Sequence, residues 1–111
     1  MNFESVTIVV QDMKKSLEFY KDVLGFSVVS ESKAFSKLAL DGFKLNLHIA
    51  NDYMKPSSGV IFNFHCSNLH EKYEQLKSRG INISPPRVEE GMSGESSSLE
   101  DPNGNTILLL A

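Results

Sequence analysis

The chain has 111 residues, of which 41% are hydrophobic and 23% are charged, and this balance suits one compact soluble domain. A formal net charge of −3 gives no basic surface of the kind that nucleic-acid binding requires, so we expect no nucleic-acid partner. The single cysteine, Cys66, excludes an internal disulfide and a cysteine-rich zinc site.

The N-terminal stretch MNFESVTIVV predicts a strand rather than a targeting segment. It holds an acidic Glu4 and only a short apolar run, which fits neither a signal peptide nor a transmembrane helix. We therefore expect a cytoplasmic protein with no membrane partner. The β-branched strand stops at Asp12.

A helix is predicted over residues 13–25. Leu17, Tyr20 and Leu24 recur there at helical spacing and form one apolar face, with Val23 and Met13 nearby. Asp12, directly before this segment, is a typical N-cap because its side chain can accept a hydrogen bond from a free backbone N–H.

The rest of the first half predicts strands, and a turn-rich linker follows it. Asp41–Gly42 is a strong hairpin signal, since both residue types tolerate positive φ. The predicted strands cover residues 26–32, 35–40 and 43–50, and the linker covers residues 51–58.

The second half repeats this order of elements. Pro85–Pro86 breaks one of its strands, which is therefore expected at a sheet edge. The segment Asp101–Gly104 predicts a tight turn before the last strand. The predicted elements are a strand at 60–66, a helix at 67–80, and strands at 81–88, 96–101 and 105–111.

Both halves thus read strand–helix–strand–strand–strand. One helix can cover only one face of each sheet, so the other face must be covered by the second sheet, by a ligand or by a partner chain. We expect an α+β fold in a single domain over residues 1–111, with module one at 1–50, the linker at 51–58 and module two at 59–111.

Two stretches carry a family resemblance, VTIVVQDMKKSLEFYKDVLGF and LEDPNGNTILLL. The first places Asp12 after a strand and continues with a Ser-x-x-Phe-Tyr helix and Leu-Gly-Phe, and the second is an Asp-Pro-x-Gly hairpin. The chain resembles the vicinal-oxygen-chelate superfamily of glyoxalases, bleomycin-resistance proteins and extradiol dioxygenases. The resemblance implies two βαβββ modules that form a curved mixed sheet around a central cup.

The metal enzymes of that family place one ligand, usually His, Glu or Gln, on each of four strands. The matching positions here are Ser5, Asn46, Ile61 and Leu108. Ile61 and Leu108 have no donor atom, and the neighbours of Leu108 on the last strand are equally apolar. We therefore expect no metal, no cofactor and no catalytic residue.

Polar side chains on the same strands are candidates for ligand contact. Asn46 and His48 share one strand face, and Asn63 and His65 share another, by period-two alternation. The histidines could equally be exposed and inert. The predicted ligand-binding set also includes a serine of the polar strand and the two apolar positions: Asn46, His48, Ile61, Asn63, His65, Ser97 and Leu108.

These observations leave three functions open. We expect a metal-independent binding protein of the bleomycin-resistance type, which sequesters an amphipathic or aromatic small molecule in a groove. The alternatives are a divalent-metal lyase, isomerase or dioxygenase, and a degenerate module that binds a partner protein. Because many relatives form their grooves between two chains, a homodimer is expected.

Overall fold

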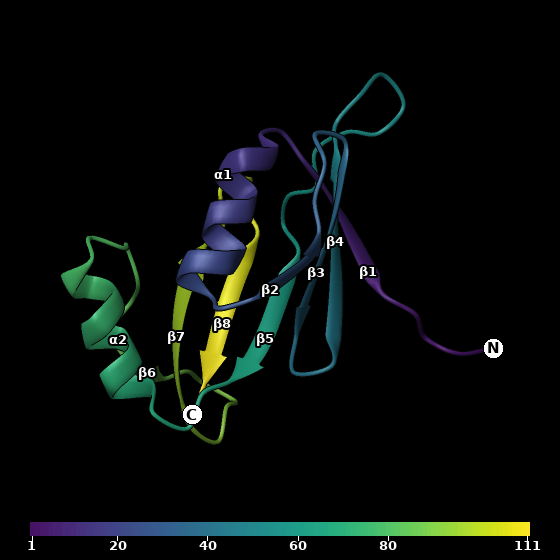
Figure 1. Ribbon diagram of the computed structural model, residues 1–111. Helices are drawn as coiled ribbons and strands as arrows, with labels where there is room; N and C mark the ends of the chain where they lie inside the picture. Colours follow the sequence, from purple (N-terminus) through teal and green to yellow (C-terminus); the bar gives the residue numbers. More distant parts are fainter. The chain divides into compact units, whose positions relative to one another are not determined.

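The computed structural model describes all residues from 1 to 111 and divides them into two compact units, Met1–Ser58 and Gly59–Ala111. Each unit holds a four-stranded mixed sheet and one helical segment, so the α+β class and the two βαβββ modules are confirmed (Figure 1). Neither helical segment is long and apolar enough to cross a membrane.

The sheet of the first unit has the strand order β1-β4-β3-β2. β1 runs parallel to β4, and the other neighbours are antiparallel. The elements of this unit are β1 (Val6–Val10), α1 (Met13–Glu18), the π-helical segment η1 (Phe19–Val23), β2 (Ser27–Ser30), β3 (Phe35–Leu40) and β4 (Phe43–Ile49).

The helix of the first unit begins as predicted but does not stay α-helical. The Asp12 side chain accepts a hydrogen bond from the Lys15 N–H at 3.0 Å, which caps α1. From Phe19 onward the chain adopts the wider π-helical turn η1. The predicted single helix over residues 13–25 is therefore corrected to an α-helix followed by a π-helical segment.

The apolar face of this helix also differs from the predicted one. The buried positions are Met13, Ser16, Tyr20 and Val23, whereas Leu17 and Leu24 are only half-buried. The apolar pattern indicated Tyr20, with Met13 and Val23 near it, but it could not indicate Ser16, which is polar yet fully buried.

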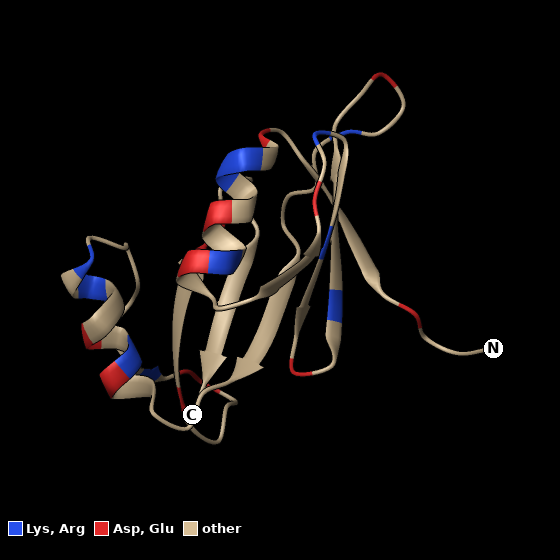
Figure 2. Ribbon diagram, in the orientation of Figure 1, with Lys and Arg blue, Asp and Glu red and all other residues tan.

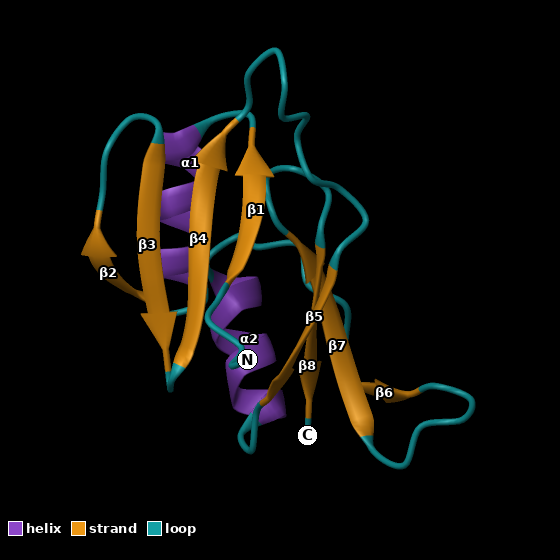
Figure 3. Cartoon of the chain, turned by 90° about the vertical axis from the view of Figure 1, so that its right-hand side faces the viewer, coloured by secondary structure: helices purple, strands orange, loops and turns teal.

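α1 covers one face of the β1-β4-β3-β2 sheet, and Figure 3 views this sheet from the other face, with α1 behind it. The covered face is apolar because alternate residues of three strands point to it: Ile8 pairs with Leu47, and Leu38 pairs with Leu45. Each of these four side chains is at most 1% exposed. They form the core of the first unit.

The predicted linker is part of the first unit. The Ser57 hydroxyl accepts from the Val9 N–H at 2.9 Å, and the Ser57 N–H donates to the Val9 carbonyl at 2.7 Å. These two bonds extend the hydrogen bonding of β1 at its outer edge. The end of the 51–58 segment is therefore bonded to β1 through Ser57, while Tyr53 in the same segment is exposed.

The sheet of the second unit has the order β5-β8-β7-β6. Its core consists mainly of Phe62, Leu69, Leu76, Ile107 and Leu109, all buried. The elements of this unit are β5 (Ile61–His65), α2 (Leu69–Ser78), β6 (Arg87–Val88), β7 (Glu95–Glu100) and β8 (Thr106–Leu110).

The predicted strand over residues 81–88 is reduced to the two residues of β6. Pro85 and Pro86 have no N–H and fix φ, so they cannot continue a ladder. Before them, Ser84 extends the edge in a different way: its N–H donates to the Ser98 carbonyl at 2.9 Å, and its hydroxyl accepts from the Ser98 N–H at 2.8 Å.

Candidate ligand-binding site

The sheet face of the first unit that α1 leaves open carries polar side chains. Thr7, Asn46 and Lys37 lie beside one another on β1, β4 and β3, in register. They alternate with the buried Ile8, Leu45 and Leu38, so they point to the opposite face, the one nearer the viewer in Figure 3.

The Asn46 side chain is held by its neighbours. Its Nδ2 group donates to the Ser5 hydroxyl at 2.9 Å and to the Thr7 hydroxyl at 3.2 Å. Because both amide hydrogens are used, Oδ1 is the atom that Asn46 offers to a ligand, and it can only accept a hydrogen bond.

His48 lies on the same face, two residues further along β4. Its Nδ1 is 2.8 Å from the Ile49 carbonyl oxygen, which can only accept, so in the neutral ring Nδ1 carries the proton and Nε2 is the acceptor. The Phe35 ring contacts the imidazole edge-on, with 5.9 Å between ring centroids. His48 is thus half-buried, oriented and packed against an aromatic ring.

A hollow of about 540 Å³ lies on this part of the first unit. It holds Asn46, which the sequence predicted, and two lysines, which it did not. Six of the residues that line it are Ser5, Val29, Phe35, Lys37, Lys44 and Asn46.

Lys37 and Lys44 are the functional candidates that sequence reasoning missed. Both alternate with buried leucines, Leu38 and Leu45, along regular strands, and this alternation is the signal that could have placed them on the open face. Lysine is usually assigned to solvent, and both side chains are indeed exposed. Their position in the hollow makes them available to a ligand.

The second unit has a comparable sheet face. Asn63 pairs with Leu108, and His65 pairs with Leu110, on the face opposite the buried Phe62 and Ile107. Neither the Asn63 nor the His65 side chain makes a hydrogen bond within the chain, and both are exposed. Ile61, on the same face, leaves 58% of its surface exposed.

Ser97 is separated from the other predicted ligand contacts of this unit. It pairs with Leu109, and it lies on the buried face with only 1% of its surface exposed. Ser98 is the serine that pairs with Leu108. Since alternation in a strand has a period of two, a shift of one residue moves a side chain to the other face.

The four positions that the resemblance matches to the family's metal ligands do not offer donors that fit a divalent metal. Ser5 and Asn46 are neutral and hydrogen-bonded to each other, while Ile61 and Leu108 have no donor atom. No group of three or more His, Cys, Asp or Glu side chains lies close enough to hold a metal ion. First-row divalent metals take imidazole, thiolate or carboxylate ligands, and none of the four positions provides one.

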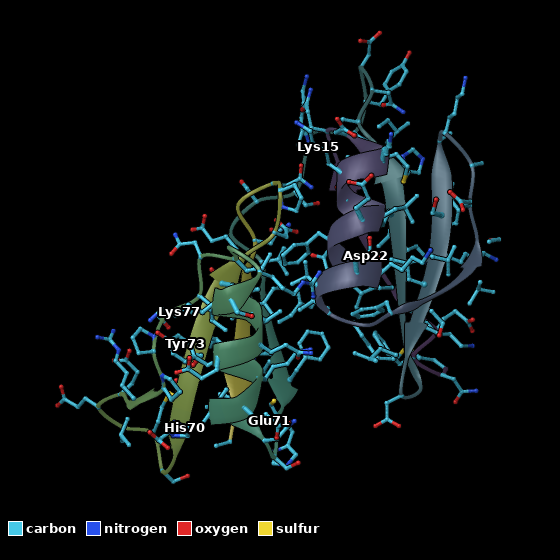
Figure 4. All side chains as sticks on the ribbon, turned by 60° about the vertical axis from the view of Figure 1, so that its left-hand side comes forward. Lys15, Asp22, His70, Glu71, Tyr73 and Lys77 are labelled. Atoms are coloured by element: carbon cyan, nitrogen blue, oxygen red, sulfur yellow. The ribbon has the colours of Figure 1, made fainter.

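The third histidine, His70, lies outside these faces. Its Nε2 is 2.8 Å from Glu95 Oε1, and the pair joins α2 to β7 at the protein surface. In Figure 4, His70 lies near one end of α2, and Tyr73 and Lys77 lie further along the helix, where the Lys77 ammonium is 5.5 Å from the Tyr73 ring centroid. These contacts hold side chains at the surface of α2.

A model of the Glyoxalase/Bleomycin resistance protein/Dioxygenase superfamily matches residues 2–109. Together with the two βαβββ modules, this match shows that the chain belongs to that superfamily. The resemblance drawn from the helix and hairpin motifs is therefore confirmed.

Two relatives match most of the chain in sequence. Metallothiol transferase FosB from Staphylococcus saprophyticus is 29% identical over 109 residues, which cover 94% of this chain and 72% of that protein. Virulence protein STM3117 from Salmonella typhimurium is 27% identical over 114 residues, covering 94% of this chain and 79% of that protein.

Solved structures share the fold. The crystal structure of STM3117 matches 99% of this chain and 95% of its own, with a TM-score of 0.78. A bleomycin-binding protein, solved in complex with bleomycin, is 24% identical and matches 99% of this chain and 98% of its own, with a TM-score of 0.74. At that identity the likeness concerns the fold alone.

Proposed function

We propose that the protein is a metal-independent small-molecule binding protein, which sequesters an amphipathic or aromatic ligand without chemical change. The observation that carries this proposal is the donor set at the four family metal positions, where Ile61 and Leu108 cannot coordinate a metal. A superfamily member that lacks the metal ligands keeps the fold and its open sheet faces for binding.

The hollow in the first unit supports the proposal. Its volume of about 540 Å³ falls in the range of small-molecule sites, about 300–1,000 Å³. Asn46, which lines the hollow, is oriented by hydrogen bonds before any ligand arrives, and this lowers the entropy lost on binding. His48 does not line the hollow, but it lies on the same sheet face and is oriented in the same way. Phe35 adds an aromatic surface that suits a flat ligand.

We also propose that residues 1–111 act as one domain in the cytoplasm. The open sheet face of the second unit is proposed as a ligand-contact surface, formed by Asn63, His65, Ile61 and Leu108. The support is that all four side chains lie on one face of the β5-β8-β7-β6 sheet. That face offers two polar groups without partners in the chain, beside two apolar side chains.

The second candidate function is a divalent-metal enzyme of the same superfamily. It is favoured by the 29% identity to a metallothiol transferase. It requires ligands other than the four family positions, and the two histidines of the open faces, His48 and His65, are the available imidazoles.

Metal analysis and ligand screening separate these functions. We expect protein purified without chelators to hold far less than one equivalent of zinc, manganese, nickel or iron. Bleomycin and a panel of flat aromatic antibiotics should include compounds that raise the melting temperature, because binding to the folded state alone stabilises it. The variant Asn46→Leu should reduce that rise, whereas Asn82→Leu, at an exposed position before β6, should not.

A stoichiometric metal ion that is lost in His48→Ala would overturn the proposal in favour of the enzyme. If the protein holds no metal and no compound of the panel raises its melting temperature, the proposal is wrong. That result would favour a module that binds another protein.

A further inference from the structure

We infer that the hollow of the first unit selects a small organic anion with an apolar body, and so fixes the charge of the ligand. This inference rests on the proposed binding function and deepens it. It follows from the two lysines of the hollow, the weakness of their pairing within the chain, and the apolar surface beside them.

The two lysines lie on neighbouring strands. Lys37 of β3 is directly opposite Asn46 of β4, and Lys44 lies two residues before Asn46 on the same strand. Both therefore flank the Asn46 amide on the open face, and Figure 2 shows basic positions on both strands. Side chains in such diagonal positions can reach one ligand group, because diagonal neighbours on paired strands are only about 7–8 Å apart.

The two lysines are not neutralised by ion pairs within the chain, so their positive charge is available to a ligand. Lys37 forms no ion pair, and Lys44 is 3.6 Å from Glu4 in a pair whose side chains are 61% and 85% exposed. Exposed pairs of this kind contribute little and are readily exchanged for a better partner. Two lysines against one glutamate give the hollow a positive local charge in a chain whose net charge is −3.

The rest of the hollow is suited to an apolar body. Val29 leaves 65% of its surface exposed there, beside Phe35 and Ala39. These three side chains and the two lysines line the same hollow, and contiguous exposed apolar surface beside polar groups is typical of ligand-binding grooves. A carboxylate near Lys37 and a hydrocarbon or ring against Val29 and Phe35 would satisfy both parts.

The test uses three compounds with one body and different charge: 4-phenylbutyrate, 4-phenylbutanol and 4-phenylbutylamine. Titration is followed by two-dimensional amide NMR at low salt, which detects weak binding and reports where it occurs. We expect the acid to bind most tightly and the amine most weakly, with the largest shifts on β3 and β4. Higher salt should weaken the binding of the acid and leave the binding of the alcohol unchanged.

Lys37→Gln should weaken the binding of the acid about threefold to fivefold, which is the effect of one exposed ion pair. The binding of the alcohol should not change. Lys55→Gln is the matched control, since this exposed lysine lies in the 51–58 segment outside the hollow. If the amine binds as tightly as the acid at these strands, or if Lys37→Gln has no effect, the charge inference is wrong while ligand binding stands. If none of the three compounds shifts the β3 and β4 amides, the inference is also wrong, and the antibiotic panel then decides the binding function separately.

Discussion

Asn105 joins two segments of the second unit through its side chain. It is 0% exposed; its Oδ1 accepts from the Val60 N–H at 3.0 Å, and its Nδ2 donates to Asp101 Oδ2 at 2.9 Å. Asn105→Ala removes both bonds and leaves the Val60 N–H without a partner. We expect the free energy of unfolding to fall by about 2–4 kcal/mol, because each buried polar group left unsatisfied costs about 1–3 kcal/mol.

Urea denaturation measures this loss, and Asn82→Ala, at an exposed asparagine, should change the midpoint little. Equal stability of the two variants would show that the turn does not depend on the Asn105 side chain.

Individual residues of the site differ in how far the sequence could predict them. Asn46 and Leu108 could be assigned to open faces because apolar and polar side chains alternate around Asn46, and because the family pattern fixes the register of the last strand. Ser97 could not, because three consecutive serines give no contrast from which to read the inward face. Lys37 was missed because lysine is expected in solvent wherever it lies.

At the level of elements, α1 is short and depends on its first turn. It spans six residues before the π-helical segment, and Asp12 supplies its side-chain cap. Asp12→Ala should lower the free energy of unfolding by about 1 kcal/mol, the usual cost of a lost N-cap. Thermal or urea unfolding checks this, with Glu18→Ala on the exposed side of the same helix as the control. A loss as large in the control would mean that the effect is one of surface charge.

The hairpin between β3 and β4 depends on its two turn residues. Asp41 and Gly42 have φ values of 47° and 83°, the left-handed pair that a two-residue hairpin requires. No atom lies within 4 Å of a Cβ added at Gly42, so Gly42→Ala tests backbone strain alone.

We expect Gly42→Ala to cost about 1 kcal/mol in unfolding free energy, the penalty for an L-residue in the left-handed region. Ala39→Gly, in the strand before the turn, is a useful comparison because it lowers strand propensity without changing the turn. An unchanged midpoint for Gly42→Ala would show that the turn relaxes to another type.

The order of the helices and strands could be predicted, but the type of helical turn and the length of the edge strand could not. Period-two and helical patterns located seven of the eight strands and both helices closely. The π-helical turn was invisible because the apolar spacing of Leu17, Tyr20 and Leu24 also fits an α-helix. The strand at 81–88 was overestimated because Pro85 and Pro86 interrupt its ladder, so that only Arg87 and Val88 pair with β7 as a regular strand.

For the whole molecule, repetition was the strongest signal. Two copies of one element order indicated two sheets with one helical segment each, and the structure confirms both. Function could not be predicted to the same depth, because a binding face is defined by side chains of several strands. The sequence argued against nucleic acid and against a metal ion as ligands. The charge of the hollow could be found only from the register of β3 and β4, which places Lys37 beside Asn46.

The homodimer remains a prediction for the whole molecule. Large apolar side chains are exposed in both units, among them Val29 at 65%, Ile61 at 58% and Val88 at 63%. Units of this size bury a limited share of their surface alone, so association would cover apolar area that otherwise faces water. Sedimentation equilibrium should give twice the chain mass of 12.4 kDa.

A charged variant tests which surface is used. Ile61→Lys places an ammonium on the open face of β5, and we expect it to shift the sedimentation mass toward the monomer, because a buried unpaired charge opposes association. Tyr53→Lys is the control, since Tyr53 is 95% exposed in the 51–58 segment and belongs to neither sheet. A monomeric parent protein at every concentration would contradict the prediction, and a dimer that persists in Ile61→Lys would place the interface elsewhere.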